Sequence, residues 1–128
     1  MLARAETIPA IVENWLSRFE RALTAPDDAE LVALFHPDSH WRDLLALSWG
    51  IRTVNGRAAI VQELRAHARR MRPSGFRTNP ERTPPRSVTR VGTQAIEAIF
   101  KFETAEGRGS GVLRLIPDVA DGDTLKAW

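Results

Sequence analysis

Apolar residues near the start of the chain recur with the period of an α-helix. Residues three, four and seven positions apart lie on one side of a helix, so this spacing predicts an amphipathic helix with a wide apolar stripe. Thr7 is placed to cap the first turn, Pro9 is tolerated there, and Pro26 ends the helix. The residues of the stripe are Ile8, Ile11, Val12, Trp15, Leu16, Phe19, Ala22 and Leu23.

Two more helices are predicted further along the chain. The first is short: Asp27 stands at its N-cap, Glu30 follows three positions on as in a capping box, and His36-Pro37 ends it. Its inner face would carry Leu31, Leu34 and Phe35. The second opens after Asn55-Gly56 and closes at Pro73-Ser74-Gly75, with an inner face of Ile60, Val61, Leu64, Ala68 and Met71.

The last third of the chain changes to the period of two that is typical of strands. Ile96, Ala98, Phe100 and Phe102 would share one face of a strand, and Glu97, Lys101 and Glu103 the other. A turn at residues 105–107 leads to a second strand over 109–116, and the turn at 121–123 leads to a third from Thr124. The proline-rich residues 76–87 read as an irregular arm or an edge strand.

The stretch from His36 to Thr53 carries the most unusual combination of residues. If residues 40–49 form a strand, one face holds Trp41, Asp43, Leu45, Leu47 and Trp49. A carboxylate on this apolar face needs a partner, because burying an unpaired charge is costly. Asp43 therefore has either a structural role, in an ion pair with Arg52 or with backbone N–H groups, or a chemical one through a perturbed pKa.

Helices first and strands last predict an α+β fold, in which three N-terminal helices pack on a curved antiparallel sheet. At 128 residues the chain suits one domain, residues 1–128. The last predicted strand starts at Thr124 and the sequence ends at Trp128, so we expect this domain to be truncated in that strand.

Composition narrows the functional classes. The chain has no cysteine, hence no disulfide and no thiolate nucleophile or ligand. No apolar run reaches the ~20 residues that span a bilayer, and the N-terminus has no signal-peptide pattern, so we expect a cytoplasmic protein without a membrane partner. Eight arginines and one acid lie between Arg65 and Arg90. This positive charge indicates either a solvated surface or a docking site for an anionic partner. The stretch has too few interleaved aromatic residues to predict nucleic-acid binding.

Residues 34–64, LFHPDSHWRDLLALSWGIRTVNGRAAIVQEL, resemble the nuclear transport factor 2-like superfamily, which includes ketosteroid isomerases and SnoaL-like polyketide cyclases. They carry its L-F/Y-x-x-D pattern and its G-x-x-A-I helix start. Within this stretch, the segment WRDLLALSW is most similar to modules fused N-terminally to flavin-dependent monooxygenases or oxidoreductases. The resemblance implies a cone-shaped fold around an apolar pocket, and often a homodimer formed through the open face of the sheet.

The same resemblance places functional residues. It puts Asp43 at the position of the isomerases' general base, and an apolar pocket would raise the pKa of that carboxyl toward neutrality. It puts Phe19 where the isomerases have a tyrosine that stabilises the enolate, and phenylalanine cannot donate a hydrogen bond. The indole N–H groups of Trp15, Trp41 and Trp49 are the remaining donors. Alternatively, Trp41 and Trp49 simply pack in the core.

The sequence gives little support for a metal site or a phosphate-binding loop. His36 and His40 lack an obvious third metal ligand, so we expect no metal site and no cofactor. His40 can act as a proton shuttle at the pocket rim, whereas His67 reads as a surface residue. The glycines of GRGSG, residues 107–111, lead into a strand and not into the helix that a phosphate loop requires.

Two functions follow from these observations. The first is a domain that binds a small apolar molecule, with contacts from Trp15, Phe19, Trp41, Trp49 and Phe100, and that assists a flavin-dependent monooxygenase or oxidoreductase. The second is a stand-alone isomerase, dehydratase or cyclase that uses Asp43 as general base and His40 as proton shuttle. In either case we expect a homodimer.

Overall fold

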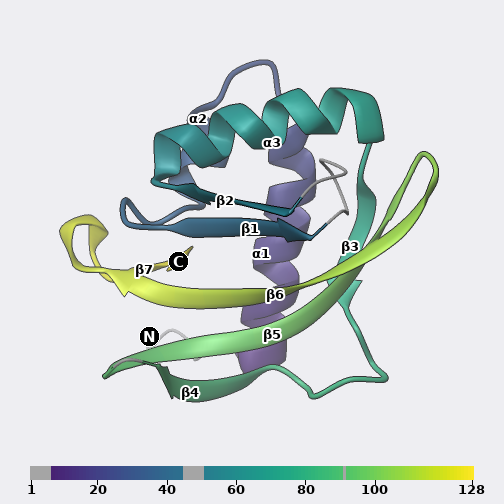
Figure 1. Cartoon of the computed structure of the whole chain (residues 1–128). Helices are drawn as coiled ribbons and strands as arrows, with labels where there is room; N and C mark the ends of the chain where they lie inside the picture. Colours follow the sequence, from purple (N-terminus) through teal and green to yellow (C-terminus); the bar gives the residue numbers. More distant parts are fainter. Residues whose placement is uncertain (1–6, 45–50, 91) are drawn as a thin grey trace, which may run out of the picture.

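The computed structural model describes residues 7–44, 51–90 and 92–128. Within them the order of elements is two helices, a hairpin, a third helix and a run of antiparallel strands (Figure 1). The order of helices and later strands is as the sequence predicts, but the hairpin stands where a strand over residues 40–49 is expected, and residues 45–49 of that strand lie outside the described residues. The bounds are α1 Ile8–Leu23, α2 Ala29–Ala33, β1 His40–Leu44, β2 Ile51–Asn55, α3 Arg57–Met71, β3 Ser74–Thr78, β4 Arg86–Arg90, β5 Thr93–Thr104, β6 Gly107–Asp118, the 3₁₀ turn η1 Val119–Asp121, and β7 Thr124–Ala127.

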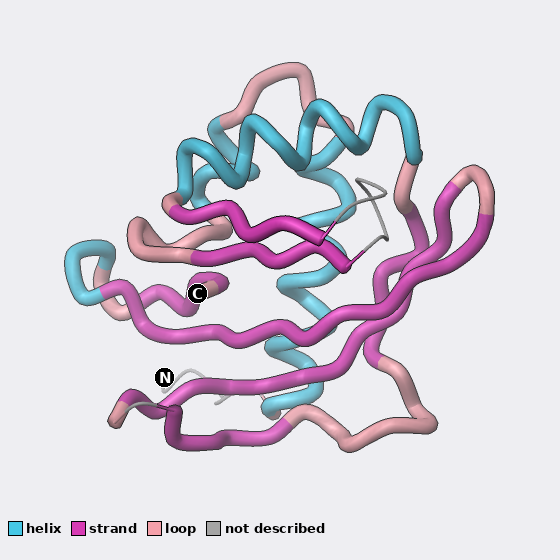
Figure 2. The backbone as a smooth tube through the Cα atoms, viewed as in Figure 1, coloured by secondary structure: helices cyan, strands magenta, loops and turns pink. Residues whose placement is uncertain are grey.

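The strands form a curled antiparallel sheet and a separate hairpin. In the five-stranded sheet, β5 pairs with β6 along one edge and with both β3 and β4 along the other, and β7 extends the sheet beyond β6. The β1–β2 hairpin is the second sheet. The larger sheet bends around α1, and α3 lies across the hairpin (Figures 1 and 2). The protein is thus α+β, with α1 packed on the curled sheet and α3 packed on the hairpin.

Helix α1 forms for the reasons that its sequence gives. Thr7 Oγ1 accepts a hydrogen bond from Ala10 N at 3.3 Å, and Pro9 stands in the first turn, where its missing N–H costs nothing. The apolar stripe is buried from Val12 to Leu23. No helix in the described part of the chain is long and apolar enough to cross a membrane.

Arg65 of α3 holds the C-terminal end of α1. Its guanidinium donates to backbone carbonyls of the last turn of α1 and of the loop that follows, and it pairs with Asp28 at 2.9 Å. One half-buried arginine therefore joins α3 to α1 and to the loop before α2. The four carbonyls belong to Ala22, Leu23, Ala25 and Pro26, at 3.4, 3.2, 2.6 and 3.3 Å.

Helix α1 also covers the outer edge of β3. Glu20 Oε1 accepts a hydrogen bond from Phe76 N at 2.9 Å, and Glu13 Oε1 accepts from Thr78 N at 3.0 Å and from Thr78 Oγ1 at 2.6 Å. The two carboxylates are two helical turns apart and bond alternate amides of the strand. They satisfy backbone donors that an edge strand otherwise leaves free.

The glycines of the GRGSG segment are explained by packing in the sheet. Phe102 pairs with Gly109 and Phe100 with Gly111 across the β5–β6 ladder. A Cβ atom at Gly109 would lie 2.5 Å from the Phe102 ring, and one at Gly111 would lie 2.6 Å from the Phe100 ring. Each aromatic ring therefore lies over the glycine opposite, and the segment is a strand start, as predicted.

Strand β7 joins the sheet to the helical layer. On one side it pairs with β6; on the other, Ala127 bonds to the chain after α2, donating to Leu34 O at 2.8 Å and accepting from His36 N at 2.7 Å. Lys126 of this strand is buried, and its ammonium contacts Asp118 at 2.9 Å and Asp121 at 3.0 Å. A charged cluster thus holds the hairpin that closes the sheet.

Two details of the sequence prediction are wrong. The capping box before α2 does not form: Asp27 accepts a hydrogen bond from Ala29 N, but Asp28 stands at the N-cap and makes no side-chain cap bond. Helix α3 ends at Met71 with Arg72 in the left-handed region, at φ 48°, and Ser74 and Gly75 already belong to β3. The proline-rich arm is a loop between two edge strands, β3 and β4.

Candidate functional site

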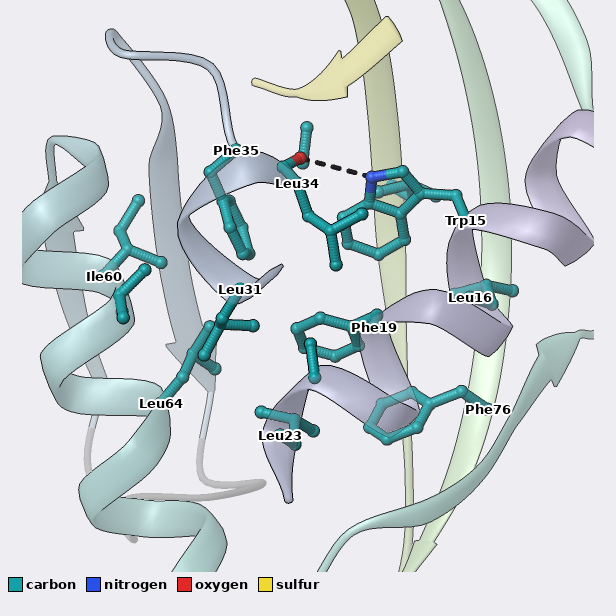
Figure 3. Close-up of a cluster of buried hydrophobic side chains, with 14 of the residues drawn as sticks. Trp15, Leu16, Phe19, Leu23, Leu31, Leu34, Phe35, Ile60, Leu64 and Phe76 are labelled. Atoms are coloured by element: carbon teal, nitrogen blue, oxygen red, sulfur yellow. Dashed lines mark hydrogen bonds between the residues drawn. The ribbon is translucent and has the colours of Figure 1, made fainter. Parts of the chain in front are cut away.

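An aromatic cluster fills the space between α1 and the inner face of the sheet. Trp15 stacks on Phe19 with ring centres 5.1 Å apart, Phe19 meets Phe76 edge-on at 5.0 Å, and Phe76 stacks on Phe102 at 4.9 Å. Phe35, after α2, contacts both Trp15 and Phe19. Figure 3 shows Trp15, Phe19 and Phe35 grouped between α1 and the chain after α2, with Phe76 of β3 beside Phe19. Such pairs add about 0.5–1.5 kcal/mol each to the burial of their surfaces.

Two predicted ligand contacts, Trp15 and Phe19, are members of this cluster. Both are buried, with 6% and 7% of their surface exposed. The indole N–H of Trp15 donates to the backbone carbonyl of Leu34 at 3.2 Å, the bond drawn in Figure 3. That donor is therefore engaged in joining α1 to α2, and Phe19 has no donor to offer.

Phe100, the third described ligand candidate, lies at the margin of the cluster. Its ring centre is 6.1 Å from that of Phe76 and 6.0 Å from that of Phe102, and its side chain is only half-buried. It is the member of the cluster with an accessible surface on the inner face of the sheet. The structure thus joins Trp15 to Phe100 through the ring contacts of Phe19 and Phe76.

Asp43 lies in β1, the strand in which the sequence predicts it. The β1–β2 register sets Asp43 opposite Arg52, the partner that the ion-pair alternative names, and Trp41 opposite Val54. The side chains of residues 41–44 and 51–53, and all of Trp49, lie outside the described residues. The roles of Asp43, Trp41 and Trp49 therefore stay predictions.

His40, the proposed proton shuttle, starts β1 and is exposed. Its Nδ1 lies 2.7 Å from Asn55 Oδ1 across the hairpin. Because an amide oxygen only accepts, Nδ1 carries the proton and Nε2 is left as the acceptor. The part of His40 in any reaction stays a prediction.

His67 is not the surface residue that the sequence suggests. Only 12% of its side chain is exposed; Nε2 lies 3.2 Å from Glu63 Oε2, and Nδ1 lies 2.9 Å from a guanidinium nitrogen of Arg70. Arginine cannot accept, so Nδ1 is the acceptor and Nε2 donates to Glu63. A charged partner on each side holds the ring on α3.

The arginine-rich stretch is divided among several structural roles. Arg65 caps α1, Arg77 pairs with Glu103 at 3.2 Å, and Arg86 lies 3.8 Å from Glu97. These three arginines therefore have structural contacts, and the choice between a solvated surface and a docking site for the rest of the stretch stays a prediction.

In the buried pair of Lys126 and Asp118, the pKa of each side chain differs from its ordinary value. The hydrogen bond from Lys126 holds the pKa of the Asp118 carboxyl below its usual value, against the opposing effect of burial. The hydrogen bonds to Asp118 and then to Asp121 raise the pKa of the Lys126 ammonium. A lysine with a raised pKa is a poor nucleophile at neutral pH, so this cluster is structural.

Over residues 7–44, 51–90 and 92–128, no group of three or more His, Asp or Glu side chains is arranged to hold a metal ion. No protein-family model matches the chain, and no curated protein matches its sequence at a significant level.

Proposed function

We propose that this chain is a nuclear transport factor 2-like domain that binds a small apolar molecule and assists a flavin-dependent monooxygenase or oxidoreductase. The observation that carries the binding role is the aromatic cluster on the inner side of the curled sheet. Its one polar hydrogen, on Trp15, is bonded to Leu34 O, so the ring surfaces around Phe100 offer apolar contact and no donor for a developing enolate. This chemistry favours binding over proton transfer.

Titration with Nile red, followed by its fluorescence, tests the binding role. We expect saturable binding to the wild-type chain and at least tenfold weaker binding to Phe100→Ser. The matched control is Ile99→Ser, since Ile99 is the neighbouring half-buried residue on the outer face of β5. Unsaturable binding to the wild type, or equal weakening by Ile99→Ser, contradicts the proposal. Melting curves of both variants ensure that folded protein is compared.

The flavoprotein association is supported by the resemblance of residues 34–64. Sequencing the DNA that adjoins the region encoding residues 1–128 tests it. An open reading frame with a predicted strand, G-x-G-x-x-G and a helix supports a flavoprotein partner. A neighbourhood without such a frame on either side contradicts it.

The second candidate is an isomerase, dehydratase or cyclase with Asp43 as general base. It is favoured by the place of Asp43 within β1, the strand on which the resemblance requires a base. With a ketosteroid as substrate, Asp43→Asn is expected to abolish turnover and leave the melting temperature unchanged. A large drop in melting temperature instead makes Asp43 the ion-pair partner of Arg52, which the backbone register sets opposite it.

The proposed assembly is a homodimer that buries the outer face of the sheet. Strand alternation puts Val112 on this face, opposite Ile99, and 56% of Val112 is exposed. Exposed apolar residues on a sheet face are candidates for contact with a second copy.

A further inference from the structure

A hollow of about 340 Å³ lies where α1 ends and α2 begins. Residues of one side of α1, at helical spacings of three and four, form most of it, and Glu30 in the first turn of α2 completes it. Its lining residues are Arg18, Arg21, Ala22, Ala25 and Glu30.

Among the described residues, neither guanidinium group at this hollow is engaged in an ion pair, and Glu30 is the acidic residue that lines the hollow with them. No hydrogen bond or ion pair joins Arg18 or Arg21 to another residue in the described part of the chain, although Arg18 is half-buried. Arg65 bonds the carbonyls of Leu23 and Ala25 and the carboxylate of Asp28. Arg21 stands in the last turn of α1, so these carbonyls, which it could otherwise cap, are already bonded.

The charges around the hollow define the ligand that fits it. Each guanidinium presents a planar pair of N–H donors that matches a carboxylate, and the methyl groups of Ala22 and Ala25 provide a small apolar surface. Glu30 is exposed, has no described partner, and accepts a hydrogen bond from a cationic group. Two cations and one anion are complementary to a molecule with two carboxylates and one ammonium group.

We propose that this hollow binds a small amphoteric dicarboxylate of the acidic amino acid class. Its two carboxylates pair with Arg18 and Arg21, and its ammonium group pairs with Glu30. The site lies outside the aromatic cluster and is independent of the apolar ligand proposed above. Its occupant would hold the end of α1 against the start of α2.

Calorimetric titration with L-glutamate and with glutarate, at constant ionic strength and neutral pH, tests this site. We expect saturable binding of glutamate, and weaker binding of glutarate because it lacks the ammonium group. Arg18→Gln/Arg21→Gln should weaken glutamate binding at least tenfold. The matched control, Arg69→Gln/Arg108→Gln, removes two exposed arginines elsewhere and should change it less than twofold.

Glu30→Gln separates a specific site from a general attraction of anions. This variant should remove the preference for glutamate over glutarate while both still bind. Unsaturable binding, equal weakening by the control pair, or a preference that survives Glu30→Gln overturns the proposal. Since no residue of the aromatic cluster is changed, these outcomes are independent of the Nile red experiment.

Discussion

The two faces of the β5–β6 ladder share one register and differ in what stabilises them. On the inner face, Phe102 lies over Gly109 and Phe100 over Gly111, so volume and ring contact determine the packing. On the outer face, Glu97 pairs with Arg114 at 2.8 Å, and Val112 is exposed. Steric fit dominates on one face and screened charge on the other, and the two faces should therefore respond differently to substitution.

The largest effect is expected from filling the space beneath a ring. Gly109→Val puts a branched side chain where even one Cβ atom would lie 2.5 Å from Phe102, so the ring or the strand must shift. Overpacking of this kind costs about 1–3 kcal/mol of unfolding free energy. Urea unfolding measures it, and Gly107→Val is the control, because a Cβ atom at Gly107 has nothing within 4 Å. Equal losses in the two variants would show that the ring contact is not the cause.

A smaller effect is expected at the buried cluster of the β6–β7 hairpin. Lys126→Met keeps the length of the side chain but removes the ammonium that lowers the pKa of Asp118. Stability contributed by a carboxyl with a lowered pKa is present above its ordinary value of 3.8 and is lost as the pH falls through the folded-state value. The unfolding free energies of wild type and variant should therefore differ most near neutral pH and converge in acid.

Urea unfolding at a series of pH values measures this difference. Lys126 itself has a raised pKa, so its own contribution is present below 10.5 and is lost only as the pH rises through the folded-state value. Lys101→Met is the control, because Lys101 is a half-buried lysine of β5 without a described charged partner. If the difference in unfolding free energy between wild type and Lys126→Met stays constant down to strong acid, the proposed role of the pair is contradicted.

A still smaller effect is expected on the charged outer face. Arg114→Gln removes the 2.8 Å contact with Glu97 but leaves Arg86 at 3.8 Å from the same carboxylate. A partly exposed pair is worth about 0–1 kcal/mol, so urea unfolding should change little. The double variant Arg86→Gln/Arg114→Gln should lose more than the two single changes together, because in each single variant the other arginine still contacts the Glu97 carboxylate. Simple additivity would mean that the two arginines act independently.

The contrast between apolar packing and charged contacts also explains which features can be predicted from the sequence. Periodicity identifies the α1 stripe and the inner face of β5, because burial repeats with the geometry of each element. It does not identify Glu13 and Glu20 as partners of β3, or Lys126 as partner of Asp118. Those contacts depend on how α1 meets a strand about sixty residues away and on the hairpin register of β6 and β7.

The same distinction applies to the two candidate sites: the sequence predicts one of them and not the other. The spacing of Trp15, Phe19 and Phe100 is enough to predict that they face inward, and the structure brings them into one cluster. The hollow beside Arg18 and Arg21 has no comparable signal. It depends on Arg65 of another helix taking the carbonyls of α1, and nothing near Arg21 in the sequence indicates that competition.

The smallest effect on the folded monomer is expected from Val112→Glu. An exposed position tolerates a charge within about 0.5 kcal/mol, so unfolding at low protein concentration should match the wild type. If the outer face joins two copies, however, the change puts like charges opposite each other across a two-fold interface and should dissociate the dimer. Sedimentation velocity over a range of concentrations measures this, with Val119→Glu as control because Val119 is 83% exposed in the η1 turn. A dimer that survives Val112→Glu places the interface elsewhere, and a wild-type chain that is monomeric at every concentration removes the homodimer from the proposal.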